Sequence, residues 1–99
     1  MTRDVRTNIC VIELECFLPD VHSLKEKRMI LRKIKDRVGR KFNVSIAEVG
    51  YQDLWQRSVI GIAAVNGDRR LLEQVKDKVL NEIEQIIPGG VTHFTVDFL

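Results

Sequence analysis

Residues 8–41 read NICVIELECFLPDVHSLKEKRMILRKIKDRVGRK, and a change of periodicity inside this stretch decides the fold. From Asn8 to Leu18 apolar and polar side chains alternate, which is typical of a strand with one face on a core. The face expected to be buried carries Cys10, Ile12, Leu14, Cys16 and Leu18. After Pro19 and Asp20 the period becomes that of an amphipathic helix. Its apolar stripe consists of Leu24, Leu31, Ile34 and Val38, with Ile30 beside them.

The two ends of this helix carry their own signals. Ser23 and Glu26 form a capping box, in which each side chain satisfies a backbone N–H near the start of the helix. The helix is read over His22–Lys41, and Gly39 near its end is a candidate C-cap, because glycine tolerates the left-handed backbone that is common at helix C-termini.

The remainder of the chain repeats these patterns. Strands are predicted at 42–49, 56–65 and 92–99, a turn at 50–55, and a second helix from Arg69 to about Ile87, capped by Asn66-Gly67-Asp68. The strand at 56–65 is apolar on both faces apart from Ser58, which indicates a central place in the sheet. The order βαββαβ predicts an α+β, ferredoxin-like split βαβ sandwich, with an antiparallel four-stranded sheet and two helices on one face.

Length and composition allow a single domain, residues 1–99, with residues 1–7 expected to form a flexible N-terminal extension. The chain shows no secretory signal and no run of about 20 apolar residues, so a cytoplasmic protein without a membrane partner is predicted. Cys10 and Cys16 lie six residues apart in one strand, too far apart for a disulfide between them. Buried thiols are expected, and no metal ion or cofactor is predicted.

Positive charge is concentrated in His22–Lys41. This segment contains nine Lys and Arg residues and two acidic residues, a net charge of +7, whereas the whole chain carries +2. Such asymmetry indicates an anionic partner. The alternative is a solvated polar face whose long side chains cover apolar surface.

The predicted topology brings the connections at 19–23, 50–55 and 88–90 to one end of the sandwich. There Trp55, Gln56 and Arg57 could stack on an unpaired base and hydrogen-bond its edge. Alternatively, Leu54 and Trp55 close the end of the core. The predicted nucleic-acid or anion-binding residues are Lys25, Lys27, Arg28, Arg32, Lys35, Trp55, Gln56 and Arg57.

The open face of the sheet is expected to carry Glu13, Glu15, His93 and Asp97. Such residues can build a metal or acid–base site, but they are more often the solvated side of a sheet, and their charge repels phosphates. Ser23 beside His22 already has a capping role, so no catalytic residues and no enzyme activity are predicted. The apolar strand at 56–65 leaves an alternative open: a protein-interaction or dimeric ligand-binding module that uses this face.

Two motifs, HSLKEKR at 22–28 and FNVSIAEVGYQDLWQRSVIGIAAVNGD at 42–68, resemble the YlxP-like family of small bacterial proteins. The resemblance extends from about Cys10 to the last strand. It implies a ferredoxin-like fold and, because family members are commonly encoded near ribosome-maturation genes, a link to ribosomes or RNA. It supplies no catalytic residues. We therefore expect a non-enzymatic RNA- or ribosome-associated module with rRNA or the ribosome as partner, and a homodimer stays open.

Overall fold

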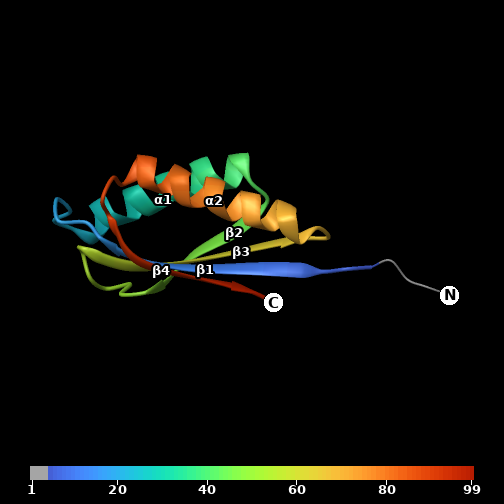
Figure 1. Ribbon diagram of the computed structural model, residues 1–99. Coiled ribbons are helices and arrows are strands. Elements are labelled where there is room, and N and C mark those ends of the chain that lie inside the picture. Colours follow the sequence, from blue (N-terminus) through green and yellow to red (C-terminus); the bar gives the residue numbers. More distant parts are fainter. Residues whose placement is uncertain (1–4) are drawn as a thin grey trace.

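The computed structural model describes residues 5–99 and shows a four-stranded sheet with two helices on one face (Figure 1). Its elements are β1 (Asn8–Phe17), α1 (Leu24–Lys41), β2 (Val44–Gly50), β3 (Arg57–Asn66), α2 (Arg69–Ile86) and β4 (Val91–Phe98). This order confirms the predicted split βαβ sandwich. Of the predicted N-terminal extension, residues 1–4 lie outside the described residues, and residues 5–7 are exposed.

The strand order is β2-β3-β1-β4, and all three pairings are antiparallel. β3 is an inner strand, as its apolar faces predicted. It pairs with β1 over ten residues, from Asn8 opposite Asn66 to Phe17 opposite Arg57. This register fixes which side chains share the open face, because facing residues on neighbouring strands point the same way.

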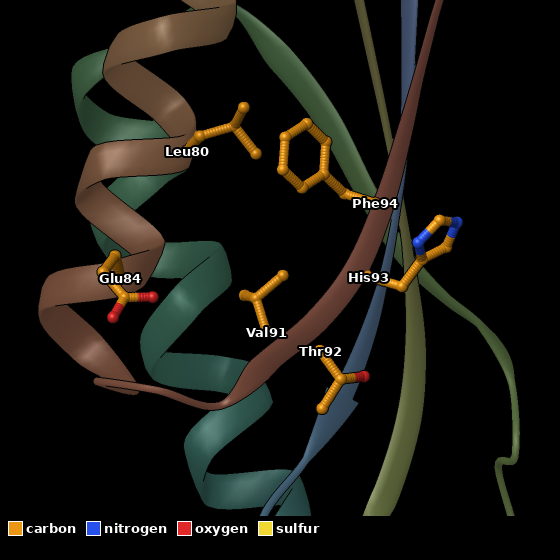
Figure 2. A pocket seen from close by; sticks show the side chains of 6 residues that line it. All are labelled: Leu80, Glu84, Val91, Thr92, His93 and Phe94. Carbon is orange, nitrogen blue, oxygen red and sulfur yellow. The ribbon is translucent and has the colours of Figure 1, made fainter.

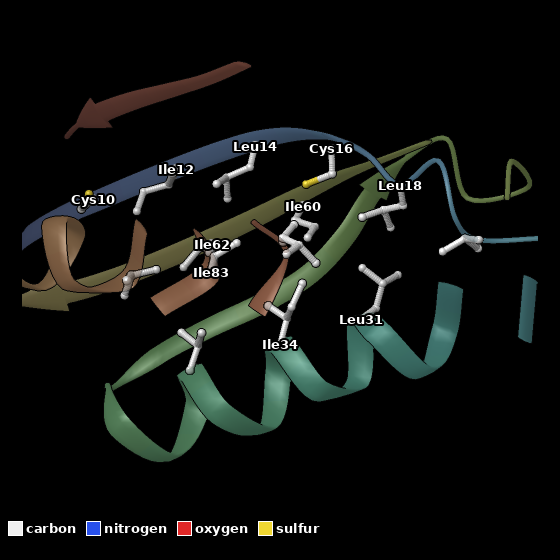
Figure 3. Packing of buried hydrophobic residues seen from close by; sticks show 14 of the residues in the cluster. Cys10, Ile12, Leu14, Cys16, Leu18, Leu31, Ile34, Ile60, Ile62 and Ile83 are labelled. Atoms are coloured by element: carbon white, nitrogen blue, oxygen red, sulfur yellow. The ribbon is translucent and has the colours of Figure 1, made fainter. Parts of the chain in front are cut away.

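The core lies between the sheet and the two helices (Figure 3). Burial raises the pKa of the Cys16 thiol to about 11 and also raises that of Cys10, so both free cysteines stay neutral and pack as small apolar groups. The predicted roles of the two thiols are confirmed. The buried hydrophobic residues are Cys10, Ile12, Leu14, Cys16, Leu18, Val21, Leu31, Ile34, Val38, Ile60, Ile62, Leu72, Val79, Ile83 and Ile87.

The capping box at the start of α1 is confirmed, but Gly39 is not the C-cap of this helix, which is Phe42. The Glu26 N–H donates to Ser23 Oγ at 3.1 Å, and the His22 N–H donates to Glu26 Oε2 at 2.9 Å. The helix continues past Gly39 to Lys41, and the Phe42 N–H still donates to the Val38 carbonyl at 2.9 Å. Phe42, the C-cap residue, packs against the core four residues after Val38, which outweighs the local preference of glycine.

Neither helix in the described part of the chain is long and apolar enough to cross a bilayer.

Candidate nucleic-acid interface

Lys27, which the sequence places among the anion-binding residues, is fully buried. Its ammonium donates to the backbone carbonyls of Tyr51 at 2.8 Å, Gln52 at 3.2 Å and Arg57 at 3.2 Å. It also forms an ion pair of 2.9 Å with Glu48 Oε2, which accepts a hydrogen bond of 2.6 Å from Ser58 Oγ. The prediction for Lys27 is therefore wrong: its donors are used inside the protein, and no phosphate can reach them.

The contacts of Lys27 join the first turns of α1 to the β2–β3 loop. Gln56 adds a second tie, because its Nε2 donates to the carbonyls of Pro19 at 3.0 Å and Val21 at 3.2 Å, in the β1–α1 connection. The predicted meeting of the HSLKEKR and YQDLWQR segments is thus confirmed. The amide nitrogen of Gln56 is already engaged, so Gln56 shapes this end of the sandwich and does not offer a free donor to a ligand.

The β2–β3 loop presents apolar side chains to solvent. Tyr51 adopts a left-handed backbone with φ of 56°, and its carbonyl accepts the Leu54 N–H at 3.0 Å. Leu54 is 46% exposed and Trp55 is 53% exposed, so the alternative in which they close the end of the core is wrong. Arg57 lies with its guanidinium carbon 4.7 Å from the centre of the Tyr51 ring. A hollow of about 560 Å³ opens beside this loop, lined by His22, Asp53, Leu54, Trp55, Gln56 and Arg57.

The other predicted cations lie on the exposed surface of α1. Lys25, Arg28, Arg32 and Lys35 are exposed, as are Lys33 and Arg40. Within residues 5–99, none of these six takes part in an ion pair. A shallow groove of about 320 Å³ runs over this surface. It is lined by one acidic residue, Asp36, together with Met29, Arg32, Lys33, Arg37 and Arg40. We call the six unpaired cations the basic face of α1.

Two further cations of α1 are held by α2. Glu82 accepts hydrogen bonds from Arg37 at 2.7 Å and from Lys41 at 2.9 and 3.0 Å. The hydrogen bond from Lys41 lowers the pKa of Glu82, with burial opposing and Arg37 assisting that shift. Sequence reasoning missed both Glu82 and the role of Lys27, although each occupies a position of its helix's apolar stripe. Lys27 follows Leu24 by three residues, and Glu82 follows Val79 by three.

The open face of the sheet divides into an acidic and an apolar part. Glu15 lies opposite His93, Glu13 opposite Thr95 and Val11 opposite Asp97, so the predicted sharing of this face by the acids and His93 is confirmed. No group of three or more His, Cys, Asp or Glu in the described part of the chain could hold a metal ion. The apolar part, which we call the apolar strip, consists of Val11, Ala47, Val49, Val59, Gly61, Ala63 and Val65.

A separate hollow of about 350 Å³ lies between α2 and the edge strand β4 (Figure 2). Leu80 and Phe94 face each other across it, and Glu84 stands at its side. His93 points to the other side of β4, away from Glu84. The hollow therefore does not bring its two titratable residues together as an acid–base pair.

Comparisons with known proteins place the chain in a family. Residues 9–96 match the family described as "Protein of unknown function (DUF503)". The chain belongs to this family. A relative in Bacillus subtilis (strain 168), "Uncharacterized protein YlxP", is 53% identical over 72 residues, which cover 73% of this chain and 78% of that protein. The resemblance to the YlxP-like family is thereby confirmed.

Solved structures share the fold of this family member at low sequence identity. The de novo designed protein Foldit4 has a TM-score of 0.61 and 14% identity, covering 95% of this chain and 97% of that one. A dimeric ferredoxin-like protein of unknown function from Thermobifida fusca has a TM-score of 0.59 and 8% identity, covering 94% and 90%. At these identities the likeness shows the ferredoxin-like fold alone.

Proposed function

We propose that this protein is a non-enzymatic, cytoplasmic RNA- or ribosome-associated module that binds phosphates through the basic face of α1. The observation that carries the proposal is the set of six exposed cations on one helix that have no ion-pair partner within residues 5–99. Unpaired like charges on neighbouring turns repel one another, and a polyanion removes that repulsion. The acids on the open sheet face favour the helix side as the place for RNA.

The placement of reactive groups supports the non-enzymatic part of the proposal. Ser23 Oγ accepts the Glu26 N–H at the helix cap. Both thiols are buried, and burial raises their pKa values, so neither is a ready nucleophile at neutral pH. Glu84 and His93 point to different sides of β4.

The test is a double charge reversal on the basic face, Arg28→Glu with Arg32→Glu. Both side chains are exposed, so folding should be intact. Binding of fluorescent rRNA fragments, followed by anisotropy between 50 and 200 mM salt, should weaken at least tenfold. The slope of log affinity against log salt should become shallower by about two, because each lost phosphate contact removes about one unit or slightly less.

The matched control is Arg70→Glu with Lys78→Glu, which makes the same charge change on exposed residues of α2. It should weaken binding by less than threefold. Equal losses in both double variants would mean that only net charge matters, and an unchanged affinity in the α1 variant would refute the proposed surface.

A homodimer through the apolar strip is a second candidate. The observation that favours it is the continuity of exposed apolar residues over β1, β3 and β2, with Val49 and Val65 each more than half exposed. Exposed apolar patches of this kind often mark self-association. The ferredoxin-like protein from Thermobifida fusca is itself dimeric, which supports this candidate. Light scattering over a range of protein concentrations tests it, and a monomer at every concentration would contradict it.

A further inference from the structure

We propose that the hollow beside Trp55 takes an unpaired base of single-stranded RNA, while the adjoining backbone lies on the basic face of α1. This inference rests on the proposed function and names the class of RNA that it binds. The hollow has a volume of about 560 Å³ and is formed mainly by the β2–β3 loop, with His22 from the β1–α1 connection. We refer to it as the Trp55 hollow.

Hydrogen bonds fix the β2–β3 loop in a conformation that leaves Trp55 exposed to solvent. Two of its carbonyls, those of Tyr51 and Gln52, and the carbonyl of Arg57 at the start of β3 accept hydrogen bonds from the buried Lys27 ammonium. Gln52 Nε2 donates to the Glu48 carbonyl at 3.1 Å, and Gln56 ties the loop to the β1–α1 connection. Trp55 is 53% exposed on this fixed frame and is the one tryptophan of the chain. A preformed aromatic surface binds without the entropic cost of ordering a loop.

The two formal charges that line the hollow, Asp53 and Arg57, cancel, so the hollow does not attract phosphate as the basic face of α1 does. Asp53 lines the hollow and repels phosphate oxygens, but a carboxylate accepts hydrogen bonds from the N–H groups of a base edge. The indole of Trp55 and the side chain of Leu54 offer apolar surface to a flat ring. Arg57 already lies over the Tyr51 ring, so the rings left to stack on a base in the hollow are Trp55, the larger one, and His22.

The start of α1 adjoins the same loop. Lys27, in the first two turns of the helix, contacts the loop directly, and Lys25 and Arg28 are exposed on those same turns. A strand that places a base at Trp55 can therefore continue with its phosphates toward Lys25 and Arg28. A duplex cannot do both, because its bases are stacked and paired inside the helix. Single-stranded RNA is the class that fits.

The test compares one 12-nucleotide RNA with the same strand annealed to its complement. For the wild-type protein, the fluorescence of Trp55 should be quenched by the single strand and much less by the duplex. Trp55→Leu should weaken binding of the single strand by about tenfold, the size of one base–aromatic stack, and leave duplex binding within twofold. Phe94→Leu, a change at an aromatic residue of similar exposure on β4, is the matched control. It should leave the affinity for the single strand and the affinity for the duplex unchanged.

Other outcomes separate this inference from the proposed function. If Trp55→Leu binds the single strand as tightly as wild type while the α1 double variant loses binding, the inference is wrong and the proposed function stands. Equal quenching by duplex and single strand also overturns it. A Trp55 emission that changes with protein concentration alone would mean that a second protein molecule occupies the hollow. If the wild type binds neither RNA, both proposals fail. The wild-type quenching decides the matter even if the leucine variant is unstable.

Discussion

Lys27 is a charged group removed entirely from water, and its partners make that position tolerable. Burying an ammonium is costly unless an opposite charge and enough acceptors surround it. Here Glu48 supplies the charge, and two loop carbonyls and the carbonyl of Arg57 in β3 supply the remaining acceptors. Among the described residues, no buried side-chain nitrogen or oxygen lacks a hydrogen-bond partner. The pair therefore fixes one arrangement of the β2–β3 loop relative to α1.

Replacing Lys27 by methionine should destabilise the protein by about 3 kcal/mol, because Glu48 and three carbonyls lose their shared donor while the apolar stem is kept. Breaking a buried ion pair costs about 3 to 5 kcal/mol, and the lower value applies here because the Glu48 side chain is 16% exposed to solvent. Urea unfolding measures the change. Lys33→Met, at an exposed and unpaired position of the same helix, should shift stability by less than about 0.5 kcal/mol. Similar effects in both variants would contradict the role given to Lys27.

The sequence does not distinguish Lys25, Lys27 and Arg28 by residue type, and only geometry separates them. Leu24 and Leu31 of the apolar stripe of α1 are separated by six residues, and Lys27 among them stands at the spacing of a core position. A charge at such a position predicts a buried partner, but the partner cannot be named from sequence. Glu48 lies on β2, and Ser58 on β3. They meet Lys27 only because the sheet register brings them there.

At the scale of elements, Glu82 is the corresponding link between the two helices. Its carboxylate on α2 is held by Arg37 and Lys41 near the C-terminal end of α1, whereas Lys27 holds the loop near the N-terminal end. The elements themselves were predictable because periodicity and turn residues dictate them locally. The C-cap of α1 was not predictable, because Phe42, which packs against the core, takes that place instead of Gly39.

The link at Glu82 predicts a pH dependence of stability. The hydrogen bond from Lys41 lowers the pKa of Glu82 below its ordinary value of 4.5 in the folded protein. A carboxyl with a depressed folded pKa stabilises the fold above its unfolded pKa, and that contribution is lost as the pH falls through the folded pKa. Glu82→Gln should therefore be less stable than wild type at pH 7, and the difference should shrink as the pH falls below 4.5.

Urea midpoints measured from pH 7 to pH 3 check this prediction. Glu73→Gln is the matched control, since Glu73 forms only an exposed pair of 3.8 Å with Arg69. Its difference from wild type should be small and nearly constant over the range. A Glu82→Gln difference that stays constant down to pH 3 would show that the carboxylate charge contributes nothing.

At the scale of the whole molecule, the helix side of the sandwich is basic and the open sheet face is partly acidic and partly apolar. The basic face of α1 lies on the helix side, and the open sheet face combines the apolar strip with Glu13, Glu15 and Asp97 on β1 and β4. This division limits how two copies can pack face to face. A two-fold axis along the strands would lay the apolar strip on the partner's acids. An axis across the strands would lay acids on acids. A dimer must be offset so that the acids stay in water.

An offset dimer that keeps Glu13 and Glu15 of β1 in water covers only β2 and β3, about 10 Å by 30 Å, or roughly 300 Å² per partner. That is less than half of what a stable interface buries, so we expect a weak dimer that forms only at high concentration. Light scattering should show the monomer mass at low micromolar protein and a rise toward twice that mass at several hundred micromolar. Ala63→Glu, in the middle of the strip on exposed β3 surface, should abolish the rise, because it places a charge in the contact. Leu71→Glu, a change at an exposed apolar residue of α2, should leave the rise unchanged. A dimer that survives Ala63→Glu would use a different surface, such as the edge of β4.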